Sequence, residues 1–108
     1  MFVYSIDCEF EQGGTGVESD LVHRWVVWMR EVHIPDVIAS GARSAEFFQF
    51  EREQPTFRVL YHFDSARAFN RYENEHAPRL RAESLREFPS KTGLSYRREC
   101  GESLGRFS

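Results

Sequence analysis

The sequence predicts a single α+β domain built from four strands and two helices. Three observations support this class. Apolar and polar residues alternate in several short segments, apolar residues recur at helical spacing in two longer ones, and glycine or proline separates the segments. A chain of 108 residues, 41% of them hydrophobic, can bury one core without metals or disulfides, and it has no room for a second domain.

The first strand covers residues 2–10. Every second position there carries an apolar or aromatic side chain, and these side chains share one face: Phe2, Tyr4, Ile6, Cys8 and Phe10. This spacing is typical of a strand that buries one face against a core. The glycine-rich segment 12–16 then predicts a loop.

The first helix begins at Ser19 or Asp20, either of which can cap it, and extends to about His33. Its apolar stripe has helical spacing and consists of Val22, Trp25, Val26, Met29 and Val32. Pro35 lacks a backbone N–H, so we expect a kink or a restart there. One more turn should follow and end at Gly41.

A hairpin and the second helix come next. Residues 43–52 and 56–63 have the character of strands, and the short link between them predicts that they pair as a hairpin. Ser65 can cap the second helix, which should kink or restart at Pro78 and continue to Pro89.

The last strand covers residues 94–100, so residues 1–100 form the domain and residues 101–108 a tail. The resulting order is β-α-β-β-α-β. Two interleaved right-handed β-α-β units give a ferredoxin-like fold, in which a four-stranded antiparallel sheet carries two kinked helices on one face.

The other face of this sheet is predicted to be bare. It should carry Val3, Leu60, His62 and one side of the segment 47–50. A wide, partly apolar sheet face is unfavourable in water, so we expect a partner to cover it. The simplest partner is a second copy of the chain, packed face to face as a homodimer.

Composition narrows the class of protein further. The chain has 14 basic and 17 acidic residues, a balance that argues against nucleic-acid binding. The longest apolar run, residues 25–29, is too short to span a membrane, and residues 1–10 lack the basic start of a signal peptide. We therefore expect a cytoplasmic protein, with Cys8 and Cys100 as reduced, partly buried thiols that do not pair.

Each predicted helix carries a His-x-Pro segment, with the histidines at His33 and His76. The two helices of this fold run antiparallel, so we expect the two imidazoles to lie far apart, and we predict no metal site and no cofactor. Hydrogen bonds to free carbonyls at a helix end explain both histidines. Alternatively, His33 lines a pocket between helix and sheet, where its imidazole could carry a proton.

Four aromatic residues are candidate walls for such a pocket: Tyr4, Trp25, Trp28 and Tyr72. Together with His33 and His76 they form the predicted ligand-binding set. The same aromatic residues at helical spacing suit a hydrophobic core equally well. Asp7 and Glu9 point the same way on the first strand, and Arg97 is an expected ion-pair partner if the last strand lies beside the first.

The segments WMREVHIPDVIASG at 28–41 and YENEHAPRLRAESLREF at 72–88 carry a family resemblance. They are similar to an uncharacterised family of small bacterial proteins whose members resemble the dimeric α/β-barrel superfamily. The likeness extends from Val3 to about Arg98. It implies a ferredoxin-like fold and a homodimer, and it brings no established activity. The wider superfamily includes cofactor-free monooxygenases, isomerases, cyclases, haem-dependent enzymes and stress-response proteins.

Three hypotheses for the function follow. The first is a homodimer that binds a small apolar or aromatic ligand between sheet and helices, or none. The second is a cofactor-independent monooxygenase, isomerase or cyclase with His33 as proton carrier. The third is an interaction subunit of a larger assembly. A pocket of several hundred Å³ with convergent polar groups is what the first two require.

Overall fold

The computed structural model describes residues 1–11, 19–89 and 92–108. The predicted loop at 12–16 lies outside them. The elements follow the predicted order: β1 (Phe2–Phe10), α1 (Ser19–Trp28), the π-helical turn η1 (Met29–His33), α2 (Ile34–Ala39), β2 (Ser44–Phe50), β3 (Thr56–Phe63), α3 (Ala66–Glu75), α4 (Ala77–Glu87) and β4 (Leu94–Glu102).

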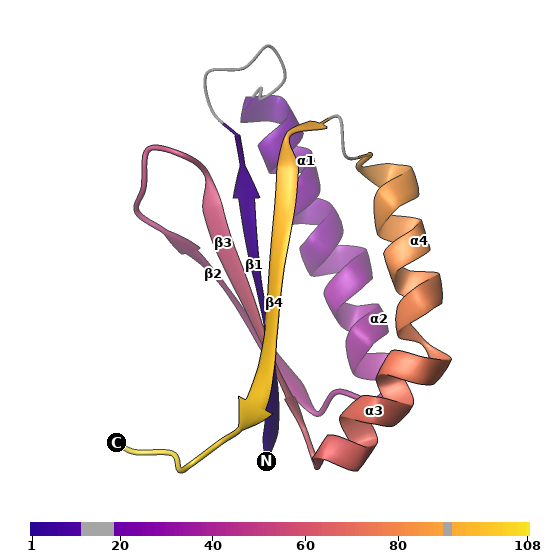
Figure 1. Ribbon diagram of the computed structural model, residues 1–108. Coiled ribbons are helices and arrows are strands. Elements are labelled where there is room, and N and C mark those ends of the chain that lie inside the picture. The colour runs from indigo at the N-terminus through magenta and orange to yellow at the C-terminus, as the bar shows by residue number, and fades with distance from the viewer. Residues whose placement is uncertain (12–18, 90–91) are drawn as a thin grey trace.

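The four strands form one antiparallel sheet in the order β2-β3-β1-β4. The described helices all cover the same face of the sheet, and none of them lies on the opposite face, which we call the bare face (Figure 1). Near the end of the inner strand β1, Cys8 lies opposite Phe57 of β3 on one side and Tyr96 of β4 on the other. The ferredoxin-like α+β fold is therefore confirmed.

The first helix accommodates Pro35 by widening the turn that precedes it. Its backbone stays helical from Ser19 to Ala39, but in η1 the N–H of Ile34 donates to the carbonyl of Met29, five residues back. Pro35 then occupies the first turn of α2, where its missing N–H costs little. His33 consequently lies inside a continuous helix, and the prediction that it lies near a helix C-terminus was wrong.

The second helix breaks at His76, two residues before the proline. The backbone of His76 leaves the helical region at φ −125° and ψ −38°, which ends α3 and starts α4 with Pro78 in its first turn. Ser65 caps α3 as predicted, because its hydroxyl accepts a hydrogen bond from the N–H of Ala68 at 3.1 Å.

The core between sheet and helices is mainly aromatic. Trp25 of α1 is fully buried and contacts the rings of Phe10 and Phe57 at centroid distances of 5.3 and 5.0 Å. Toward the other end of the sheet, Phe63 packs edge-on against Phe69 of α3. Burial of this much aromatic surface, with edge-to-face contacts, is the main stabilising contribution to the fold.

Strand β4 extends to Glu102, two residues beyond the predicted end, and residues 103–108 then leave the body of the domain. Cys8 is buried and Cys100 is exposed, so the prediction that both thiols are partly buried was wrong for Cys100. The two cysteines do not pair, as predicted, because Cys100 lies opposite Tyr4 and Cys8 opposite Tyr96.

Candidate functional site

A small cavity lies between the sheet and the helices. It has a volume of about 30 Å³, which is room for one or two water molecules. Strands β1 and β4, the turn η1 and helices α3 and α4 supply its walls. The lining residues are Tyr4, Ile6, Cys8, Met29, His33, Tyr72, Leu80, Arg81, Ser84, Tyr96 and Arg98.

His33 is a neutral imidazole in this cavity wall. Burial lowers its pKa to about 4, although the carboxylates of Asp36 and Glu83 act in the opposite direction. Its ring stacks on the indole of Trp28 at a centroid distance of 5.2 Å. Near neutral pH the imidazole can therefore donate one hydrogen bond and accept another, and it carries no charge.

Hydroxyl groups and arginines make up the remaining polar lining. The guanidinium of Arg81 donates to the hydroxyl of Tyr4 at 3.2 Å and to the carboxylate of Glu73 at 2.7 Å. Burial raises the pKa of Tyr72, and it raises the pKa of Tyr96 to about 12, so both phenols stay protonated. The guanidinium of Arg98 lies over the Tyr96 ring at 5.1 Å.

The structure brings together three of the six predicted site residues. Tyr4, His33 and Tyr72 line the cavity, whereas Trp25 is packed in the aromatic core. Trp28 lies behind His33, between its ring and Phe88. His76 forms the joint between α3 and α4, and it does not line the cavity with His33.

Sequence reasoning missed four polar residues of the lining: Arg81, Ser84, Tyr96 and Arg98. A signal for two of them was present, because Leu94, Tyr96 and Arg98 alternate along the last strand and so share its helix-facing side. Within the described ranges of the chain, no three His, Cys, Asp or Glu side chains are placed to hold a metal ion.

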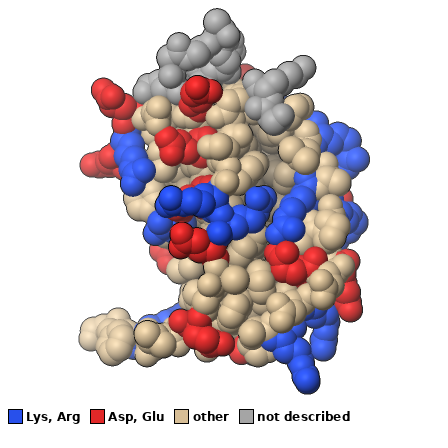
Figure 2. Space-filling model, in the orientation of Figure 1, with Lys and Arg blue, Asp and Glu red and all other residues tan. Residues whose placement is uncertain are grey.

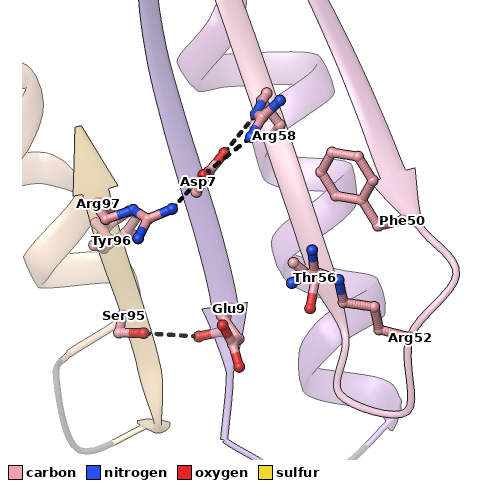
Figure 3. A pocket seen from close by; sticks show the side chains of 9 residues that line it. All are labelled: Asp7, Glu9, Phe50, Arg52, Thr56, Arg58, Ser95, Tyr96 and Arg97. Atoms are coloured by element: carbon pink, nitrogen blue, oxygen red, sulfur yellow. Dashed lines mark hydrogen bonds and ion pairs between the residues drawn. The ribbon is translucent and has the colours of Figure 1, made fainter. Parts of the chain in front are cut away.

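A larger hollow lies on the bare face of the sheet (Figure 3). Its volume is about 370 Å³. At its centre the carboxylate of Asp7 accepts two hydrogen bonds from Arg58, at 2.6 and 3.2 Å, and forms an ion pair with Arg97 at 3.5 Å. The hydrogen bond from Arg58 lowers the pKa of Asp7. The predicted Asp7–Arg97 contact is confirmed, and Arg58 is an additional partner that we did not predict.

Aromatic and cationic side chains extend the hollow toward β2. The ring of Phe50 has two guanidinium groups near its centroid, Arg52 at 5.5 Å and Arg58 at 5.2 Å. Such contacts attract a guanidinium group to the face of an aromatic ring. The hollow therefore combines three arginines with two acids, Asp7 and Glu9.

Around the hollow, the bare face carries the half-buried apolar side chains that the alternation predicts. Val3 lies opposite His62, and Leu60 lies opposite Ser5. The hydroxyl of Ser44 lies 3.4 Å from the Nδ1 atom of His62 at the same end of the sheet. This face therefore combines half-buried apolar side chains with paired charges.

The comparison with protein families covers almost the whole chain. Residues 1–99 match the family model described as a domain of unknown function, DUF4286, and the chain belongs to this family. No curated protein sequence matches the chain. In the part of the chain that the structure describes, no helix is long and apolar enough to cross a membrane.

Solved structures share the fold at low sequence identity. A dimeric ferredoxin-like protein from an uncultured marine organism has 14% identity and a TM-score of 0.71, with 100% of this chain and 99% of that chain covered. A proposed antibiotic biosynthesis monooxygenase from Deinococcus radiodurans has 7% identity and a TM-score of 0.69, with coverages of 100% and 97%. An ethyl tert-butyl ether D family protein from Bacillus halodurans has 13% identity, a TM-score of 0.59 and coverages of 96% and 100%.

Proposed function

We propose that the protein acts as a homodimer in which two copies pair through the bare faces of their sheets. The observation that carries the proposal is the composition of this face. It presents the half-buried apolar side chains of Val3, Phe48 and Leu60 on a surface that none of the described helices covers. Apolar surface of this kind gains free energy when a second surface excludes water from it.

Charge complementarity favours a second copy as the partner. The bare face holds the acids Asp7, Glu9, Glu46 and Glu99 and the bases Arg58 and Arg97, which both pair with Asp7. A two-fold axis brings each residue of one copy opposite a residue of the other, so a face with both signs can pair with itself. That a solved structure with this fold is described as a dimeric ferredoxin-like protein agrees with this arrangement.

Analytical ultracentrifugation tests the proposal directly. The chain of 12.7 kDa should sediment as a species of twice that mass. The variant Leu60→Asp places an uncompensated charge in the centre of the bare face and should dissociate the dimer. The matched control Leu85→Asp changes an exposed leucine of α4, 57% accessible, and should leave the dimer intact. A wild-type protein that stays monomeric at all concentrations would contradict the proposal.

A second candidate function is the binding of a small apolar or aromatic ligand beside His33. The cavity favours it because the hydroxyls of Tyr4 and Tyr72 and the neutral imidazole of His33 converge on apolar walls. Its volume of about 30 Å³ is too small for an aromatic ring. A ring-sized ligand therefore requires side chains of the lining to move apart.

The related enzyme hypothesis, with His33 as proton carrier, depends on the same movement. A proton acceptor works best when its pKa is close to the working pH, and burial holds the pKa of His33 at about 4. Access of water to the imidazole, or an anionic ligand beside it, would raise this pKa toward neutrality. In the free protein His33 is better suited to hydrogen-bond a ligand than to move its proton.

Phenol is a suitable probe for the ligand hypothesis. Titration of phenol into the protein should shift the imidazole resonances of His33 and change the fluorescence of Trp28, which stacks on it. The variant Ser84→Phe fills the cavity and should abolish both changes. If millimolar phenol alters neither signal in the wild-type protein, small aromatic compounds do not bind beside His33.

A further inference from the structure

Residues 103–108 form an arm that extends from the end of β4 away from the body of the domain (Figures 1 and 2). The arm carries the two most exposed large hydrophobic side chains of the described residues, Leu104 at 95% and Phe107 at 89%. Its base is fixed to the sheet, because the N–H of Ser103 donates to the carbonyl of Met1 at 2.8 Å. Two large apolar side chains are thus exposed to water beyond the end of β4.

The arm has a definite shape of its own. Gly105 has φ +147°, a conformation that side chains rarely adopt, and the ring of Phe107 folds back over it. A Cβ atom added at Gly105 would lie 3.0 Å from the Phe107 ring. This turn places the Phe107 ring over Gly105, where the ring remains accessible for docking on another surface.

The arm also borders the bare face of the sheet. A groove of about 470 Å³ lies between the arm, at Ser103, Gly105 and Arg106, and the end of the sheet, at Ser44 and His62. Ser44 and His62 belong to the bare face, where they are cross-strand neighbours. The groove and the arm are therefore continuous with the surface that the homodimer would use.

We propose that the arm is a clasp whose Leu104 and Phe107 side chains are buried against the second copy of the chain. This inference rests on the proposed homodimer. The second copy is the occupant because the arm borders the face that the copy covers, and a two-fold axis would give each protomer one arm to offer and one to receive. The clasp would add apolar contact to a face that also carries the charged hollow around Asp7.

Sedimentation equilibrium of arm variants tests the clasp. The double variant Leu104→Ala/Phe107→Ala removes the apolar groups and should raise the dimer dissociation constant on the order of 100-fold, since burial of such side chains dominates binding at small contacts. Gly105→Ala keeps both groups but displaces the Phe107 ring, so it should weaken the dimer by about tenfold. Leu85→Ala, on the exposed side of α4, is the control and should have no effect.

Thiol labelling gives a second measurement that does not depend on affinity. In the background Cys100→Ser, which removes the exposed thiol, the variant Leu104→Cys should react more slowly with iodoacetamide in the dimer than at dilutions where the chain is monomeric. An unchanged dissociation constant in both arm variants, together with equal labelling rates, would overturn the clasp. A wild-type chain that never dimerises would instead overturn the proposed homodimer and the clasp with it.

Discussion

The two faces of the sheet are made by alternate residues of the same strands, yet they differ in what holds them in place. On β1, Cys8 is fully buried under the helices, and its neighbour Asp7 points to the bare face with a quarter of its side chain exposed. The covered face is fixed by close packing of aromatic rings, the bare face by hydrogen-bonded charges. One face is therefore sensitive to changes in volume and the other to changes in charge.

Strand β4 shows where the covered face ends. Its helix-facing residues become more accessible along the strand, from the buried Leu94 through the half-buried Tyr96 to the exposed Arg98 and Cys100. The helices therefore leave the far part of this edge strand uncovered. The cavity beside His33 includes Tyr96 and Arg98 at this transition, which is why polar groups can line it without being sealed in the core.

The largest effect should come from truncating a ring on the covered face. Phe57→Ala removes a buried side chain that contacts Phe10, Trp25 and Phe47, and it should lower the free energy of unfolding by about 3–5 kcal/mol. The matched variant Leu60→Ala, on the bare face of the same strand, should cost less than half as much. Urea titration, at a protein concentration where the chain is monomeric, measures the free energy of unfolding of both variants. Equal losses of stability in the two variants would contradict the distinction between the faces.

An intermediate effect should come from lowering the pH, which protonates His33 on the covered face. Because burial lowers the pKa of His33 from 6.5 to about 4, the unfolded chain binds a proton between these pH values that the folded chain does not. Stability is then complete above pH 6.5 and falls as the pH drops toward 4, with a loss of about 2–3 kcal/mol from this residue.

The variant His33→Gln should lack this part of the pH dependence in urea titrations at pH 7 and pH 4.5. An NMR titration of the wild-type imidazole gives an independent measurement of the pKa. A titration midpoint between pH 6 and 7 would show that the imidazole is solvated and is not buried on the covered face.

The smallest effect should come from the bare face. Asp7→Asn removes the charge that Arg58 and Arg97 share, and at pH 7 it should lower the free energy of unfolding of the monomer by about 1 kcal/mol. The hydrogen bond from Arg58 lowers the pKa of Asp7 in the folded state. The stabilisation is therefore present above the unfolded pKa of about 4 and is lost as the pH falls through the lower, folded value.

Urea titrations of the wild type and Asp7→Asn should accordingly converge in strong acid. Glu9→Gln is the control, since Glu9 lies two residues further along the same face and forms no salt bridge in the described part of the chain. A difference between wild type and Asp7→Asn that does not change with pH would mean that the carboxylate charge is unimportant.

Periodicity predicts the covered face well because burial there depends on local spacing. The alternation over residues 2–10 places Cys8 and Phe10 in the core, and the capping residue Ser65 marks the start of α3. Proline positions predict that each helix is interrupted, but the interruptions lie a few residues before the prolines, in η1 and at His76. How the backbone relieves a missing N–H depends on packing, which spacing does not encode.

The cavity beside His33 and the hollow around Asp7 were harder to predict, because both combine residues that are distant in sequence. Arg58 and Asp7 are 51 positions apart, and Arg81 and Tyr4 are 77 positions apart. Predicting such pairs requires knowledge of the strand order and of where α4 crosses the sheet. The aromatic set was predicted as a pocket, but Trp25 fits among Phe10 and Phe57 so closely that it belongs to the core instead.

The wide turn η1 has a consequence for how the first helix tolerates changes in length. A π-helical turn holds one residue more than an α-helical turn, so the additional residue is absorbed locally. The wide turn adds one residue between Trp25 and Val37 without breaking the helix, and both of these side chains are fully buried. The turn beside the His33 cavity thus accommodates the additional residue, and the helix on each side of it still packs against the core.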